Sequence, residues 1–100
     1  MLSVRLEKDV PDVVVSLSGN LDMMTGEVLQ ETIKSLDSAQ VHSLTFSIGG
    51  LDFIDSTGVG QLLKYYKRCA AKDICFRIEN DNPEIEEILK IIGIRELVES

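Results

Sequence analysis

The sequence predicts an α/β fold: a single domain over residues 1–100, with a mixed sheet of four to five strands and amphipathic helices packed on it. Segments in which apolar and polar residues alternate are typical of strands, and segments with apolar residues three and four apart are typical of helices. They follow in the order strand, strand, helix, strand, helix, strand, helix, and strands separated by helices pair in parallel through right-handed crossovers. The length of 100 residues suits one domain with one modest core.

The first two strands are predicted to form an antiparallel hairpin. Apolar and polar side chains alternate over residues 2–6, and residues 13–17 form a more continuous apolar run. Pro11 and its acidic neighbours lie between the two runs and favour a turn, because proline cannot donate a hydrogen bond within a central strand. Gly19 and Asn20 are turn residues, so we expect them to end the second strand.

The first helix is predicted to follow this hairpin. Thr25 is a suitable N-cap, and Glu27 places a negative charge at the positive end of the helix dipole. Gly26 in the opening turn weakens the helix slightly. Its apolar face consists of residues at helical spacing: Val28, Leu29, Ile33 and Leu36.

The second half of the chain alternates strands and helices. Residues 44–48 alternate like a strand, a helix is predicted from about residue 57 to residue 71, and residues 75–78 form the next strand. The last helix has clear end signals: Asn82 as its N-cap, with a proline directly behind it, and Gly93 as its C-terminal cap. Beyond it, residues 97–98 are expected to add a short final strand or a short piece of helix.

Composition argues against nucleic acids and membranes as partners. The net charge of −7 disfavours binding to nucleic acid or anionic lipid, because phosphate neutralisation needs clustered lysine and arginine. No apolar run approaches the roughly 20 residues that span a bilayer. Charged residues interrupt the apolar pattern of residues 1–8, so we expect no signal peptide and a cytoplasmic protein.

The two cysteines and the single histidine are not spaced as a metal site. Cys69 and Cys75 are six residues apart without CxxC spacing, and His42 lies in a polar connection before a strand. A zinc site built from these residues would be short of ligands. We therefore expect no metal and no cofactor, two reduced cysteines in the core, and a histidine in a surface loop.

The segment over residues 53–60 is the most informative part of the chain. Asp55, Ser56 and Thr57 come at the end of an apolar run, directly before the second predicted helix. On residue type alone, Ser56 is expected to be the N-cap of this helix. Unpaired backbone N–H groups and the positive end of the helix dipole gather there, so the position accommodates a phosphate. Phosphorylation would add about 1.5 to 2 negative charges.

Catalytic alternatives lack the residues that they need. A serine nucleophile needs a base within reach, and nothing in the sequence places His42 near Ser56. The glycine that precedes the serine of a nucleophile elbow is missing, as are the P-loop and dinucleotide-binding patterns. We therefore do not expect an enzyme. Gly58 and Gly60 are expected to allow close packing of the helix on the sheet.

Three aspartates remain as candidates for a site. Asp22, Asp52 and Asp55 could collect magnesium, and with it a nucleotide, if their loops converge. The more common role of such residues is to cap turns and helix starts through their side-chain oxygens. The sequence alone leaves both interpretations open.

Two motifs resemble those of the STAS-domain anti-sigma factor antagonists. The segment LDFIDSTGVG, residues 51–60, resembles the phosphorylation motif of this family. The segment GNLD, residues 19–22, followed by Thr25, resembles its second marker, a Gly-x-Leu/Ile-Asp loop before the first helix. Both motifs occur at the family's spacing, and the order of strands and helices agrees along essentially the whole chain.

The resemblance implies a small mixed sheet covered by helices and a role in transcription regulation. The unphosphorylated protein would bind an ATP-dependent serine kinase that is also an anti-sigma factor, so that the sigma factor is released. The kinase would then phosphorylate Ser56, with Thr57 as the less favoured acceptor, and the modified protein would no longer bind. A PP2C-type phosphatase would restore the binding form.

The same resemblance implies which residues contact the partner: Asn20, Leu21, Asp22, Asp55, Ser56, Thr57, Gly58 and Gln61. Along the second helix, Lys64, Tyr65 and Arg68 share a polar face with Gln61 that contacts an acidic partner or is simply solvated. Asn20 stands where many members have Glu, and the longer C-terminal element of many members is not expected. The alternative is a STAS module of another complex, such as a stressosome-like scaffold or a lipid-transport ATPase subunit.

Overall fold

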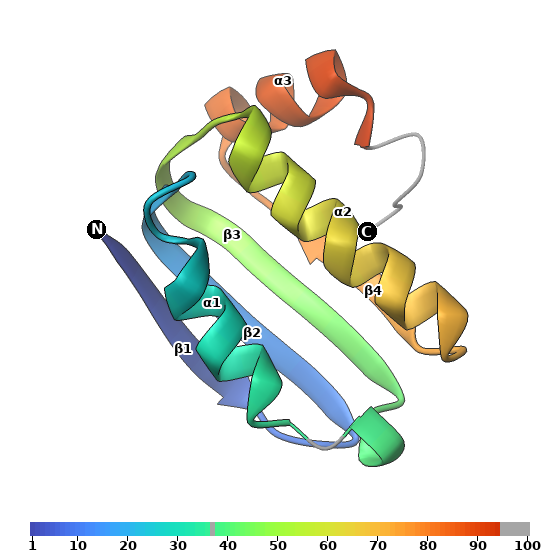
Figure 1. The fold of residues 1–100 in the computed structure, drawn as a ribbon. Coiled ribbons are helices and arrows are strands. Elements are labelled where there is room, and N and C mark those ends of the chain that lie inside the picture. The colour runs from blue at the N-terminus through green and yellow to red at the C-terminus, as the bar shows by residue number, and fades with distance from the viewer. Residues whose placement is uncertain (37, 95–100) are drawn as a thin grey trace.

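The computed structural model describes residues 1–36 and 38–94, which form one sheet with three α-helices against it (Figure 1). The strands are β1 (Leu2–Lys8), β2 (Asp12–Leu21), β3 (Ser43–Ile54) and β4 (Cys75–Glu79). The helices are α1 (Gly26–Lys34), α2 (Ser56–Ala71) and α3 (Pro83–Ile92), with a short 3-10 helix at Ser38–Gln40. This arrangement confirms the predicted α/β fold and its order of elements.

The sheet is mixed and has the strand order β1-β2-β3-β4. β1 pairs antiparallel with β2, whereas β2, β3 and β4 run parallel to one another. The predicted antiparallel hairpin and the predicted parallel pairing are therefore both confirmed. Because β2 and β3 are parallel neighbours, the loops that follow them leave the sheet at the same edge.

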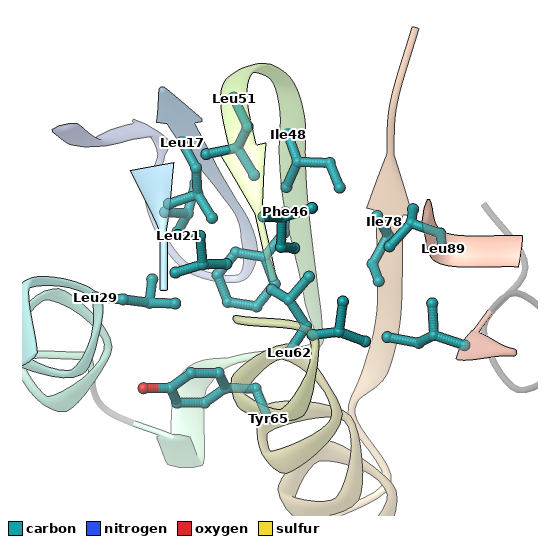
Figure 2. Close-up of a cluster of buried hydrophobic side chains, with 14 of the residues drawn as sticks. Leu17, Leu21, Leu29, Phe46, Ile48, Leu51, Leu62, Tyr65, Ile78 and Leu89 are labelled. Carbon is teal, nitrogen blue, oxygen red and sulfur yellow. The ribbon is translucent and has the colours of Figure 1, made fainter. Parts of the chain in front are cut away.

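All three helices pack on one face of the sheet. Phe46 of β3 contacts the Tyr65 ring of α2 at a centroid distance of 5.7 Å, and it pairs in register with Ile78 of β4. Figure 2 shows Phe46 in the middle of the core, with Leu62 and Tyr65 reaching it from α2 and Leu89 of α3 beside Ile78. The largest fully buried side chains are Leu17, Leu21, Leu29, Phe46, Ile48, Leu51, Ile54, Leu62, Ile78, Ile85, Leu89 and Ile94.

The second and third strands are longer than their sequence patterns indicate. We expected Gly19 and Asn20 to end β2, but this was wrong: the strand continues to Leu21, and Asn20 pairs with Phe53 of β3. Register shifts on both sides of residue 18 allow the pairing to continue. Gly19 takes a φ of 91°, and the N–H of Asn20 donates to the carbonyl of Met1 at 3.0 Å. The pairing of Asn20 and Leu21 with β3 extends the strand.

Both ends of α3 follow the predicted signals, whereas the start of α1 does not. Asn82 caps α3 by accepting a hydrogen bond from the N–H of Glu84, and Gly93 ends it with a φ of 91°. Thr25 lies at the N-cap position of α1, but its side chain makes no capping hydrogen bond. The expectation for Leu97 and Val98 lies outside the described residues.

The cysteines are both free, but only one of them is in the core. Cys69 is buried, as expected, whereas Cys75 is exposed. The expectation was wrong for Cys75 because it alternates with the inward-facing Phe76 and Ile78 and so points away from the helices. His42 is exposed between two elements, as expected. None of the described helices is both long enough and apolar enough to cross a lipid bilayer.

Candidate functional site

The two sequence motifs meet at the carboxyl ends of the neighbouring strands β2 and β3. Asn20 and Leu21 pair with Phe53 and Ile54 at the carboxyl ends of these strands, and the N–H of Asp55 donates to the carbonyl of Leu21 at 3.4 Å. Segments more than 30 residues apart in the sequence, such as those of the pair Leu21 and Ile54, therefore form one surface. This juxtaposition depends on the extension of β2, which local sequence patterns did not predict.

Gly58 allows α2 to begin directly against the end of β2. A Cβ atom at this position would overlap the carbonyl oxygen of Leu21 and would lie 2.9 Å from Cγ1 of Ile54. The expectation of close packing is therefore confirmed for Gly58. It is wrong for Gly60, where an added Cβ atom would meet nothing within 4 Å.

Gln61 connects the second helix to the loop between β2 and α1. Its side-chain amide Nε2 donates to the backbone carbonyl of Asp22 at 3.1 Å. The side chain of Gln61 also fills the space beside Gly26, where any Cβ atom would collide with it. The sequence suggested only that Gly26 weakens α1. The structure shows that the missing side chain makes room for this contact.

The loop after β2 is held by side chains of its own. Asp22 accepts a hydrogen bond from the N–H of Met24 through Oδ1, at 2.9 Å. The hydroxyl of Thr25 donates to the carbonyl of Asn20 at 2.8 Å and accepts from the N–H of Asp22 at 3.1 Å. These contacts close a tight turn, and they explain why Thr25 does not cap α1.

Asp55, and not Ser56, is the N-cap of α2. Its Oδ1 accepts a hydrogen bond from the N–H of Gly58 at 2.8 Å, and its carbonyl accepts the first helical hydrogen bond from Val59 at 3.0 Å. Ser56 is the first residue of the helix, and its side chain is exposed. The prediction that Ser56 caps the helix was wrong because β3 continues to Ile54 and leaves the residue next to it, Asp55, in the capping position.

The hydroxyl groups of Ser56 and Thr57 are both accessible. Both residues are exposed, and neither hydroxyl makes a hydrogen bond to any residue in the ranges 1–36 and 38–94. The N-terminus of α2 supplies backbone N–H groups and the positive end of a 16-residue helix beside them. This arrangement suits an anion attached to either oxygen.

The aspartates of the site cap backbone groups. Asp22 and Asp55 each accept a backbone N–H bond, which confirms the capping interpretation for these two residues. Asp52 is exposed on β3. Among the described residues, no three His, Cys, Asp or Glu side chains lie close enough together to hold a metal ion.

Three exposed apolar side chains close to the ends of β2 and β3 were missed by the sequence analysis. Met23 and Met24 are 73% and 82% exposed in the loop after β2, and Phe53 is 47% exposed near the end of β3. Large apolar side chains this exposed are typical of surfaces that bind other proteins. The signal was present: two consecutive methionines directly follow the polar GNLD segment.

The remaining predicted contacts divide into exposed and buried residues. Lys64 and Arg68 are exposed on α2, as expected. Tyr65 was assigned wrongly to the polar face: it is only 4% exposed because its ring packs on Phe46 (Figure 2). Leu21 and Gly58 are also buried. They pack beneath the surface of the site and present no side chain on it.

Comparisons with known proteins agree with this fold. The STAS domain family matches residues 3–99. The anti-sigma F factor antagonist of Paenibacillus polymyxa is 27% identical over 94 residues, which cover 93% of this chain and 80% of that protein. An anti-sigma factor antagonist from Mycobacterium paratuberculosis superimposes with a TM-score of 0.85 at 21% identity, over 98% of this chain and 83% of that one.

The anti-sigma factor antagonist SpoIIAA has the same fold in two states. Its unphosphorylated form matches with a TM-score of 0.79 at 23% identity, over 97% of this chain and 86% of that one. Its phosphorylated form matches with a TM-score of 0.71 at 21% identity, over 99% of this chain and 89% of that one. The match to the family profile spans nearly the whole sequence, and the protein is a member of the STAS domain family.

Proposed function

We propose that this protein is an anti-sigma factor antagonist. In its unphosphorylated form it binds an anti-sigma factor that is also a serine kinase, the sigma factor is released, and phosphorylation of Ser56 ends the interaction. The observation that carries the proposal is the Ser56 hydroxyl, which is exposed at the start of α2 and has no hydrogen-bond partner among the described residues. The names of the similar proteins support the same role. The protein itself performs no catalytic step in this scheme.

The accessibility of Ser56 supports its role as phosphate acceptor. A kinase must bring its nucleotide within bonding distance of the hydroxyl, so a buried or hydrogen-bonded serine would first have to be released. Ser56 needs no such step, because Asp55 already caps the helix. Thr57 is exposed as well and is the secondary acceptor.

Charge provides the switch. A phosphate would place about 1.5 to 2 negative charges next to Asp55, on a protein whose net charge is already −7. Repulsion from acidic groups of the partner, together with lost close packing, would weaken binding by a few kcal/mol, or roughly a hundredfold. The dipole and N–H groups of α2 stabilise the phosphate within the free protein, so the fold need not change.

The exposed residues around Ser56 form the proposed contact surface. Asn20 lies at the end of β2 and Asp22 in the loop that follows, and Gln61 contacts this loop from α2; all three are half-buried. Met23, Met24 and Phe53 add exposed apolar area near the ends of β2 and β3. Leu21 and Gly58 act indirectly because they fix the position of α2 against β2.

Incubation with the cognate kinase and ATP, followed by intact mass measurement, tests the proposal. We expect one added phosphate, which is absent in Ser56→Ala and present in the matched variant Thr57→Ala, and its removal by a PP2C-type phosphatase. Ser56→Ala should bind the kinase as tightly as the wild type, and Ser56→Asp should bind at least about tenfold more weakly. Equal affinity of all three proteins would contradict the switch.

An unmodified mass would favour the alternative assignment. In that case the protein would serve as a STAS interaction module of another complex, such as a stressosome-like scaffold or a lipid-transport ATPase subunit. Isolation of the complex from the native host, with identification of the proteins that co-purify, separates these two assemblies from a kinase complex.

A further inference from the structure

A cavity of about 320 Å³ lies between α1 and α2, on the helical side of the sheet. Its size is at the lower end of the range for small-molecule sites, about 300–1,000 Å³. The α2 residues in its wall, such as Tyr65 and Cys69, follow Ser56 by nine and thirteen positions. At the rise of an α-helix this places the cavity about 13–20 Å from the Ser56 surface, so it is a separate site.

The floor of this cavity is apolar. Ile33, Val41 and Ile74 are half-buried in its wall, and Leu44 is buried at the start of β3. They come from α1, from β3 and from the connections that precede β3 and β4. Aliphatic side chains gathered from four segments provide a surface that an apolar ligand body can cover.

Basic side chains line the same cavity. Lys34 of α1, Arg68 of α2 and Lys72 at the end of α2 are all in its wall, and none of its eleven described lining residues is Asp or Glu. The guanidinium of Arg68 lies 5.8 Å from the centroid of the Tyr65 ring, which holds it at the cavity. The protein has 10 Lys and Arg and 17 Asp and Glu, so the charge of this cluster is opposite in sign to the net charge of the protein.

The hydroxyl of Tyr65 supplies a polar group inside. The residue is only 4% exposed, and its hydroxyl makes no hydrogen bond within the described part of the chain. Figure 2 shows this hydroxyl directed from α2 toward α1. Burial raises the pKa of the phenol, with the charge of Arg68 opposing, so the group is protonated at neutral pH and can donate a hydrogen bond.

We propose that this cavity binds an amphipathic carboxylate, in which an apolar chain of medium length ends in one carboxylate group. The chain covers the aliphatic floor, and the carboxylate accepts hydrogen bonds from the Tyr65 hydroxyl, the Arg68 guanidinium and the Lys34 ammonium. Charge complementarity selects an anion over a neutral amphiphile, and the small volume selects a free acid over a complete lipid. The proposal does not depend on the role of Ser56.

Titration of the ¹⁵N-labelled protein with decanoate, below its micelle-forming concentration, tests the proposal. We expect saturable shifts of backbone amide signals around Ile33, Tyr65 and Cys69, and no shifts at Asp22 or Ser56. The neutral probe 1-decanol should bind at least about tenfold more weakly, because it lacks the charge-assisted hydrogen bonds. Absence of saturable shifts, shifts centred elsewhere, or equal affinity for 1-decanol would each overturn the proposal.

Two matched double variants test the role of the cations. Lys34→Gln with Arg68→Gln removes two charges from the cavity wall, and should weaken decanoate binding about tenfold or more while leaving 1-decanol binding unchanged. Lys64→Gln with Lys67→Gln removes two exposed charges from α2 outside the cavity. This control should weaken decanoate binding less than about twofold. Equal weakening by the two double variants would overturn the proposed site.

Discussion

Replacing Gly58 with alanine tests the contact that brings the two motifs together. The added Cβ atom would overlap the carbonyl oxygen of Leu21 and would lie 2.9 Å from Cγ1 of Ile54, and both neighbours are fixed by the sheet. Overpacking of this kind costs about 1–3 kcal/mol, whereas the better helix propensity of alanine returns about 0.5–1 kcal/mol. We therefore expect Gly58→Ala to lower the free energy of unfolding by about 1–2 kcal/mol.

Gly60→Ala is the matched control because it adds the same methyl group to the same helix. Its Cβ atom would meet no heavy atom within 4 Å, so only the gain in helix propensity remains. The free energy of unfolding should rise by about 0.5–1 kcal/mol. Urea denaturation followed by far-UV circular dichroism measures both variants. A Gly58→Ala protein as stable as Gly60→Ala would refute the close approach of α2 to the end of β2.

Three further predictions concern single side chains. Asp55→Ala removes the cap of α2 and should lower the free energy of unfolding by about 1 kcal/mol in the same urea titration, and an unchanged midpoint would contradict the cap. Ellman's reagent should label Cys75 in the folded protein but Cys69 only on unfolding, because Cys69 is buried and burial raises the pKa of its thiol. Equal labelling rates for the two thiols would contradict the burial of Cys69. Burial also raises the pKa of the Tyr65 phenol above its ordinary value of 10.0. As the pH rises above 10.0, the unfolded chain therefore loses the phenol proton before the folded protein does, and the free energy of unfolding falls. In urea titrations at alkaline pH, Tyr65→Phe should show a shallower fall than the wild type, and an identical pH dependence would contradict the burial of the phenol.

Local patterns predicted the elements of the sheet and its helices but not the length of β2 and β3. Alternation and helical spacing are properties of neighbouring residues, and they identified all four strands and all three α-helices of the described chain. The continuation of β2 depends on pairing with Phe53 and Ile54 of β3, which lie more than 30 residues away in the sequence. A turn signal such as Gly19-Asn20 cannot reveal a contact of this kind.

The sequence predicted that the two motifs lie near helix starts, but not which structural role each residue has there. Asp55 and Ser56 are both good capping residues, and only the end of β3 decides which one caps α2. Tyr65 and Tyr66 are adjacent, and the sequence analysis assigned Tyr65 to the polar face. In the structure α2 places Tyr65 against Phe46, whereas Tyr66 is half-buried.

The capping of α2 by Asp55 has a consequence for the proposed cycle, in which Ser56 is phosphorylated and dephosphorylated repeatedly. The Ser56 hydroxyl makes no contact that stabilises the described fold, because Asp55 already accepts the hydrogen bond from the N–H of Gly58. Modification of Ser56 should therefore remove no contact that stabilises the folded state. Each cycle would then change the affinity of this surface for its partner without unfolding the protein, and so without making it a substrate for proteases.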